Sequence, residues 1–285
     1  MAVRLGAHMS IAGGVDKAFD RGEQVGCDAM QIFTKNSNQW YAAPLSEETI
    51  QRYHQRQRET GIAPVVAHSS YLLNLASPSD ELWHKSIDSL VLEMQRCEVL
   101  DIQHLVIHPG SHMGAGEEVG IQRIIQALDI AHARLPDARV KVTLEITSGQ
   151  GDHLGYRFEQ IAAIIQGVEA GERLAVCFDT CHALSAGYDF RTPEGYAHVL
   201  RQFDAIIGLH RLAVIHLNDS LKEPGSRRDR HAHIGEGFVG LDGFRLILND
   251  PRFEHIPMLL ETPKSEDMHE DVENLARLRA LLQSP

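Results

Sequence analysis

Six short apolar runs in this chain each end at a histidine or a carboxylate. The six terminal residues are His68, His108, Glu145, Asp179, His216 and Glu261. Successive members of this series are 34 to 45 residues apart, which is about the length of one strand, one crossover helix and two loops. The series therefore predicts repeated strand-helix units, each of which presents a polar group at the carboxyl end of its strand.

Eight apolar segments have the length expected of strands, and amphipathic stretches lie between them. The segments span residues 3–8, 29–33, 64–68, 104–108, 141–146, 174–179, 212–217 and 256–261. One intervening stretch has a helix start at Ser46, Glu47 and Glu48 and a stop at Gly61. Eight such alternations predict an α/β fold, a (β/α)8 TIM barrel, in which residues 1–285 form a single domain.

Composition excludes several classes of protein. No run approaches ~18 uninterrupted apolar residues, and the first ten residues lack a secretory signal, so we expect a cytoplasmic protein without a membrane partner. The four cysteines are dispersed and are expected to be reduced and mostly buried; they are Cys27, Cys97, Cys177 and Cys181. A formal charge of −12 argues against general electrostatic affinity for nucleic acid, although it leaves out any bound metal.

The strand-end residues are of the types that bind metal. The carboxyl ends of barrel strands meet at one mouth, and imidazole and carboxylate groups supply the nitrogen and oxygen ligands of zinc and related ions. Any one of these residues alone is better interpreted as a polar group near a loop, but six together favour a metal cluster. His104 opens its strand, which places it at the opposite end, and His8 is expected either to support another side chain or to face the substrate.

Most of the other histidines fall in predicted helices or at their edges. Solvated or capping roles are expected for them, and they are His54, His84, His132, His198, His210, His255 and His269.

Two local patterns add candidate ligands. Asp179 is followed three residues later by His182, where the strand should turn into a helix, so both side chains can face the mouth. Asp229 and His231 are two residues apart, and in an extended segment such side chains point the same way. The intervening Arg230 would point elsewhere, and His233 is a less favoured ligand than His231.

Long motifs make the whole chain similar to the endonuclease IV family, the apurinic/apyrimidinic (AP) endonucleases of base-excision repair. The motifs are GAHMSIAGG (6–14), FTKNSNQW (33–40), HSSYLLNL (68–75), HPGSH (108–112), GQGDHLG (149–155), DTCHALSAGYD (179–189) and HLNDS with GSRRDRHAHIGEG (216–237). Glycines 235 and 237 of the last motif suit a tight loop that is closely approached by its neighbours.

The resemblance implies three metal ions, normally zinc, with manganese or iron as an alternative at one site. The first would be held by His68, His108 and Glu145, the second by Glu145, Asp179, His216 and Glu261, and the third by His182, Asp229 and His231. Glu145 and Glu261 are accordingly expected to be catalytic. Three divalent ions would outweigh the four carboxylates by about two charges, which suits a phosphodiester guest.

The implied activity is hydrolysis of the bond 5′ to an abasic site in duplex DNA, which leaves a 3′-hydroxyl and a 5′-deoxyribose phosphate. Trimming of blocked 3′ ends, a monomeric state and association with the nucleoid are also expected.

Recognition of the lesion is expected from the loops at the mouth. Tyr71 and Leu72 are candidates for an apolar wedge that fills the gap left by a missing base. Six further residues are predicted to contact DNA phosphates or a groove, although solvated loop positions explain them equally well. They are Lys35, Asn36, Trp40, Arg227, Arg228 and Arg230.

Three positions depart from the family pattern, and two other functions compete. Ile146 stands where an asparagine is common, Asn38 where a basic residue can occur, and Leu184 where an aromatic residue is found. A metal-dependent sugar isomerase on a similar barrel would need fewer metals, so the third ligand set argues against it. A noncatalytic binder of damaged DNA would use zinc only to hold its loops, and the open coordination expected between two ions argues against that.

Overall fold

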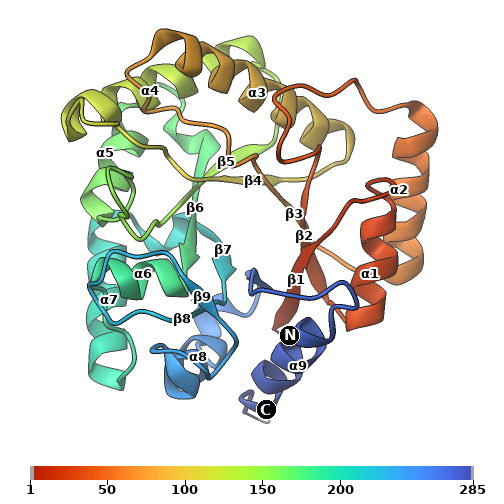
Figure 1. Cartoon of the computed structure of the whole chain (residues 1–285), viewed down its shortest axis with the longest axis vertical. Coiled ribbons are helices and arrows are strands. Elements are labelled where there is room, and N and C mark those ends of the chain that lie inside the picture. The colour runs from red at the N-terminus through yellow and green to blue at the C-terminus, as the bar shows by residue number, and fades with distance from the viewer. Residues whose placement is uncertain (1–2, 284–285) are drawn as a thin grey trace.

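Eight parallel strands close into a barrel in the computed structural model, which describes residues 3–283 (Figure 1). The order around the barrel is β1, β10, β7, β6, β5, β4, β3 and β2. The strands are β1 (Arg4–Met9), β2 (Ala29–Phe33), β3 (Val65–His68), β4 (His104–Ile107), β5 (Lys141–Glu145), β6 (Leu174–Asp179), β7 (Leu212–His216) and β10 (Pro257–Leu260). Each predicted strand is confirmed to within one residue at either end.

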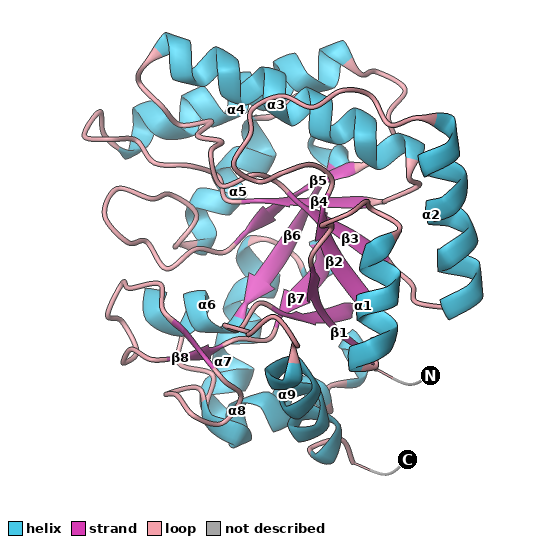
Figure 2. Cartoon of the chain, turned by 45° about the vertical axis from the view of Figure 1, so that its right-hand side comes forward, coloured by secondary structure: helices cyan, strands magenta, loops and turns pink. Residues whose placement is uncertain are grey.

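Helices surround the strands (Figure 2). They are α1 (Lys17–Val25), α2 (Glu47–Thr60), α3 (Asp80–Val99), α4 (Glu117–Arg134), α5 (Phe158–Gly167), α6 (Thr180–Ala186), α7 (Pro193–Ile206), α8 (Gly240–Leu248) and α9 (His269–Ala280), with short 3-10 helices at Gly171–Arg173, Leu209–Arg211 and Pro251–Phe253. The predicted limits of α2 are confirmed, because the Ser46 hydroxyl accepts a hydrogen bond from the Thr49 amide and Gly61 ends the helix with a φ of 69°. The α/β barrel inferred from the sequence is therefore the observed fold.

The interior of the barrel explains why the site lies at its mouth. A small apolar cluster consists of Ala29, Val66, Val106, Cys177, Val214 and Leu259. Each of these residues lies two positions before a polar residue on its strand or immediately after it, so both side chains point to the same face. The apolar layer fills the barrel below, and the polar layer is left at the carboxyl end, where ligands can reach it.

A small hairpin is added beside the mouth. The two-residue strands β8 (Asp219–Ser220) and β9 (His231–Ala232) pair in antiparallel fashion and enclose the loop 221–230. Ser220 is paired with His231, so this hairpin brings the RDRH segment back toward the end of β7.

Two expectations from composition can be compared with the structure. All four cysteines are free and buried, as predicted. Among residues 3–283, the helices are too short or too polar to span a bilayer. Residues 1, 2, 284 and 285 of the predicted domain lie outside the described part of the chain.

Candidate metal centre

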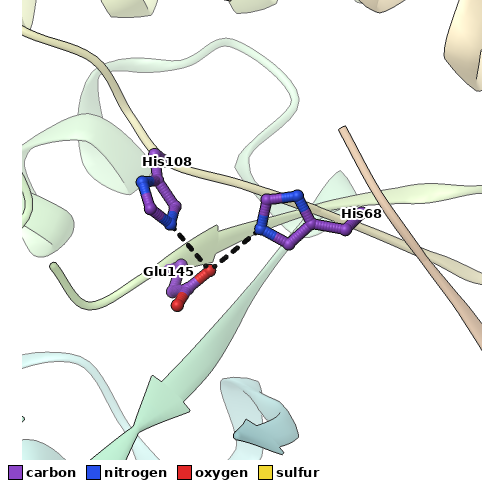
Figure 3. Close-up of side chains that lie close together, drawn as sticks. All are labelled: His68, His108 and Glu145. Atoms are coloured by element: carbon purple, nitrogen blue, oxygen red, sulfur yellow. Dashed lines mark hydrogen bonds and ion pairs between the residues drawn. The ribbon is translucent and has the colours of Figure 1, made fainter. Parts of the chain in front are cut away.

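The first predicted ligand group is brought together at the barrel mouth. His68 and His108 come from β3 and from the end of β4, and the Nε2 atom of each lies 3.3 Å from the same oxygen, Oε2 of Glu145 (Figure 3). The Glu145 side chain is completely buried, whereas His108 is partly open to solvent. Two imidazole nitrogens and one carboxylate oxygen thus converge on one point.

The second group uses the other oxygen of the same carboxylate. His216 Nδ1 lies 3.2 Å from Glu145 Oε1, 3.2 Å from Glu261 Oε2 and 3.8 Å from Asp179 Oδ2. Glu145 therefore stands between the two groups, with one oxygen facing each.

The third group is completed by the hairpin. His182 Nε2 is 3.1 Å from Asp229 Oδ2, and His231 Nε2 is 3.4 Å from Asp229 Oδ1. In all three groups the candidate donor atoms lie within 4.8 Å of one another. The Nε2 atoms of His182 and His231 are buried, and beyond these ion-pair contacts with carboxylates neither makes a hydrogen bond within residues 3–283. A divalent cation would satisfy both nitrogens, so the residues present fit a metal ion.

The electrostatics of the cluster follow from its close packing. Burial opposes ionisation of Glu145 and Glu261, but His216 and the other surrounding histidines together outweigh burial and hold the pKa of both carboxyls well below the usual value. Burial lowers the pKa of His182, yet Asp179 and Asp229 together raise it well above its ordinary value. The protein's own groups thus balance carboxylates against protonated imidazoles, and metal cations can replace those protons.

Local structure positions Asp179 and His182 as the sequence predicts. Strand β6 ends at Asp179 and α6 begins at the next residue, so the Asp179 carboxylate caps the helix and accepts a hydrogen bond of 2.7 Å from the His182 amide. Its other oxygen accepts from Asn218 Nδ2 at 2.6 Å. The carboxylate is therefore held in one orientation from two sides.

Comparisons with known proteins agree with these motifs and this geometry. Residues 19–282 match the protein family described as xylose isomerase-like TIM barrel. A probable endonuclease 4 of Chloroflexus aurantiacus is 53% identical over 280 residues, which cover 98% of each chain. The chain belongs to the endonuclease IV family. The crystal structure of endonuclease IV from Thermus thermophilus is similar with a TM-score of 0.85, 38% identity and 98% of each chain covered.

Sugar-converting enzymes share the fold with this member of the endonuclease IV family. A 3-keto-D-glucoside 4-epimerase from E. coli superimposes with a TM-score of 0.70 over 98% of this chain and 99% of that one, at 14% identity. At this level of identity the likeness extends to the barrel alone.

Three residues outside the strand-end series also belong to the site. Gln31 is buried in the middle of β2. Its Oε1 accepts from His216 Nε2 at 2.9 Å, and its Nε2 donates to Glu261 Oε1 and, at 3.0 Å, to His8 Nδ1. His8 lies 3.7 Å from Glu261 and thus supports a predicted ligand. The sequence signal that could have identified Gln31 as a site residue is that it is the single polar residue in the apolar run AMQIF. His153 of the GQGDHLG motif lines the cavity above the cluster.

Asp219 fixes the segment that follows His231. Its buried carboxylate accepts hydrogen bonds from the amides of Gly235 at 2.9 Å, Gly237 at 3.1 Å and Val239 at 2.8 Å. A side chain at position 237 would lie 2.3 Å from the Ser220 carbonyl oxygen, which explains the glycine there. The closely approached loop that the motif predicts is therefore present.

The predicted wedge residues lie at the opening of the cluster. A cavity of about 460 Å³ is lined by Tyr71 and Leu72 together with His68, His108 and Glu261. Tyr71 is 63% exposed, and its ring centroid lies 5.1 Å from that of His68 and 5.9 Å from that of His108. These two side chains can thus meet a molecule that enters the cavity.

The other predicted DNA contacts lie on two loops at the mouth. Asn36 is exposed, and Trp40 is half-buried beneath the Lys85 ammonium group, which lies 4.8 Å from its ring centroid. Arg227 lies 4.2 Å from the ring centroid of Tyr156, while Arg228 and Arg230 are exposed on the hairpin loop. Contact between these residues and DNA stays a prediction.

Lys35 is placed differently from the prediction. Its side chain is 1% exposed, and its Nζ lies 3.0 Å from Glu93 Oε1. The ammonium group is therefore neutralised inside the protein and is not offered to a phosphate. His132 also differs from the solvated or capping role expected of it, because it is buried in α4 with neither ring nitrogen hydrogen-bonded within the described chain.

The three departures from the family pattern leave the ligand groups intact. Ile146 is buried, and its backbone carbonyl oxygen lies 3.1 Å from His182 Nδ1, so a backbone group holds the ring on that side. Leu184 lies in the hydrophobic core, and Asn38 is exposed on the loop after β2.

Proposed function

We propose that this chain is a metal-dependent AP endonuclease of base-excision repair. It hydrolyses the phosphodiester 5′ to an abasic site in duplex DNA, leaving a 3′-hydroxyl and a 5′-deoxyribose phosphate, and it trims blocked 3′ ends by the same reaction. Membership of the endonuclease IV family supports a nuclease acting on DNA. The observation that carries the proposal is the Glu145 carboxylate, which joins two ligand groups beside a third at one open mouth.

Three zinc ions are the proposed cofactors, with manganese or iron as an alternative at one position. The imidazole and carboxylate donors that converge in each group are those that zinc prefers. Metal ions bound there would activate water at neutral pH and neutralise the charge that grows on the attacked phosphate.

The protein's own side chains set the geometry of the reaction. Glu145 lies below the cavity, completely buried, and keeps the first two groups at a fixed separation. Glu261 lines the cavity itself, and Gln31 and His8 restrain its Oε1 atom. Asp229 lines the cavity as well, but Glu261 belongs to the group that shares Glu145, so we assign to Glu261 the contact with the reacting phosphate or the water that attacks it.

Selection of damaged DNA is assigned to the rim of the cavity. An abasic nucleotide has no base to read, and it costs least to rotate out of the helix because pairing and stacking are already missing. Tyr71 and Leu72 stand where a wedge would fill the gap, and the exposed Arg228 and Arg230 are available to backbone phosphates. Because the chain carries a net charge of −12, attraction to DNA must come from such local groups and from bound metal.

The decisive experiment combines metal analysis with a cleavage assay. The purified protein is incubated with a short duplex that contains one tetrahydrofuran residue and with the same duplex undamaged. We expect incision on the 5′ side of the tetrahydrofuran residue only, by protein that carries close to three divalent ions per chain. A fully metal-loaded protein that leaves the damaged duplex intact would refute the proposal.

A further inference from the structure

Two loops at the mouth are tied to one helix through buried charged residues. The loop after β2, residues 34–43, carries Asn36 and Trp40, and the loop after β3 carries Tyr71 and Leu72. Both loops contact Glu93, and the first also contacts Arg96. These two residues project from the same side of α3 and are 1% and 7% exposed.

Glu93 connects the two loops directly. Its Oε1 lies 3.0 Å from Lys35 Nζ in the first loop, and its Oε2 accepts a hydrogen bond of 3.1 Å from the Ser70 amide in the second. Ser89 Oγ donates to the same carboxylate at 3.3 Å. Ser70 immediately precedes Tyr71, so the buried carboxylate acts on the backbone next to the proposed wedge.

The rest of the first loop is held from the same side. Lys35 Nζ donates to the Gln39 carbonyl at 2.6 Å. Arg96 donates from Nε to the Thr34 carbonyl at 2.8 Å and from a terminal nitrogen to the Ala43 carbonyl at 2.7 Å. Both ends and the middle of the loop are therefore fixed relative to α3.

A direct bond also joins the two loops. Ser70 Oγ donates to the Ser37 carbonyl, so the 34–43 loop is bonded to the segment that carries Tyr71 and Leu72. Buried ion pairs generally stabilise a fold little compared with apolar residues of the same size. We therefore expect the Lys35–Glu93 pair to fix the position of the loops that it joins more than to stabilise the fold.

We propose that Lys35 and Glu93 are positioning residues for lesion recognition. They hold the Tyr71–Leu72 segment and the 34–43 loop at the height above the His68 ligand group that a damaged duplex requires. This inference rests on the proposed function, because the wedge matters only if the chain binds abasic DNA. It also gives the buried Lys35 a role other than phosphate binding.

The test uses Lys35→Met and Glu93→Gln, each of which removes one charge of the pair and leaves a side chain of similar size. Misplacement of a contact group by about 1 Å can cost up to ~10²-fold, so we expect KM for the tetrahydrofuran duplex to rise roughly 10-fold or more. Because the ligand groups are untouched, kcat and the metal content per chain should stay within about 2-fold of the unaltered protein.

Two controls separate positioning from a general loss of structure. Lys35→Arg keeps the charge and should restore most of the affinity for the damaged duplex. Arg252→Met removes the partner of the buried Asp250, in the 3-10 helix that precedes β10 at the opposite end of the barrel, and should leave KM unchanged. Thermal unfolding of every variant shows whether it is folded at the assay temperature.

The outcomes distinguish this inference from the proposed function. If the unaltered, metal-loaded protein does not incise the damaged duplex, the proposed function fails. If it does incise, and Lys35→Met shows an unchanged KM or a fall in kcat alone, the positioning role is refuted while the function stands. If Glu93→Gln does not fold, Lys35→Met with its Lys35→Arg control still decides the question.

Discussion

Both ends of the barrel have a cavity lined by histidines, but the two ends differ in whether carboxylates face those histidines. The carboxyl-terminal end has the cavity of about 460 Å³, in which histidines face carboxylates. The amino-terminal end has a larger cavity of about 800 Å³, lined by three histidines that include His104. There His104 Nδ1 lies 3.1 Å from the Thr143 hydroxyl oxygen, and burial and Lys141 lower its pKa to about 4.

This difference shows that neither cavity size nor histidine content identifies the site. Carboxylates at the carboxyl-terminal end raise the pKa of the buried His182, whereas no carboxylate contributes to the shift of His104. Groups that compensate one another's charge can be buried together, and such a cluster is what a divalent cation requires.

The largest effect on DNA cleavage is expected from Glu261→Gln, at the carboxyl-terminal end of the barrel. The substitution keeps the shape of the side chain but removes the carboxylate that we propose binds a metal ion and contacts the attacking water, so single-turnover cleavage of the tetrahydrofuran duplex should fall by roughly 10²–10⁴-fold. Binding of that duplex should change far less. Equal losses in cleavage and binding would contradict the catalytic role of Glu261.

A smaller effect is expected from the glutamine that orients two ligands. Gln31→Ala removes hydrogen bonds to His216 and Glu261, and loss of such a supporting contact typically lowers metal affinity by about 10- to 100-fold. Competition with a metal-binding dye measures this affinity. Gln103→Ala, which alters the lining of the amino-terminal cavity, is the matched control and should have no effect.

Arg228→Ala tests whether the hairpin loop contacts DNA phosphates. Loss of one phosphate contact should lower the affinity for damaged and for undamaged duplexes by a similar factor. It should also reduce the slope of log affinity against log salt concentration by about 1. Arg139, which is 75% exposed and precedes β5 at the other end, provides the control Arg139→Ala. An unchanged slope for Arg228→Ala would remove this residue from the interface.

The smallest effect is expected in the acid stability of the amino-terminal end. His104 binds a proton less readily in the folded protein, with a pKa of about 4, than in the unfolded chain, where it is near 6.5. Protonation therefore favours unfolding, and stability is lost as the pH falls from about 6.5 toward 4. Replacement by glutamine, which does not titrate, should make the unfolding temperature less dependent on pH in this range. An identical pH dependence in both proteins would show that His104 does not contribute.

The fold and the meeting of the strand-end residues at one mouth could be predicted because both follow from local periodicity, whereas the division of these residues into three groups rested on the family resemblance. A strand-end residue such as His68 shares its face with Val66 two positions earlier, and the closed barrel then brings all strand ends to one mouth. The spacing of Asp179 and His182 is equally local, because it reflects the start of a helix. Neither inference requires knowledge of a distant partner.

The positions of Lys35 and Gln31 could not be predicted, because distant residues determine them. Lys35 lies in a motif that looks like an exposed loop, and only its contact with Glu93 on α3 shows that it is buried. Gln31 is a single polar residue in an apolar strand, and its role depends on His216 and Glu261 from other strands. Sequence spacing carries no information about such pairs.

The shared Glu145 carboxylate has a consequence for how the protein acquires its metals. Since one oxygen faces the His68–His108 pair and the other faces His216, an ion that binds on one side withdraws electron density and orients the donor on the other. If ions bind at the first two positions as proposed, their occupation would be thermodynamically linked, and each ion would change the affinity for its neighbour by the same factor. Titration of the apoprotein with metal should then show interdependent loading steps.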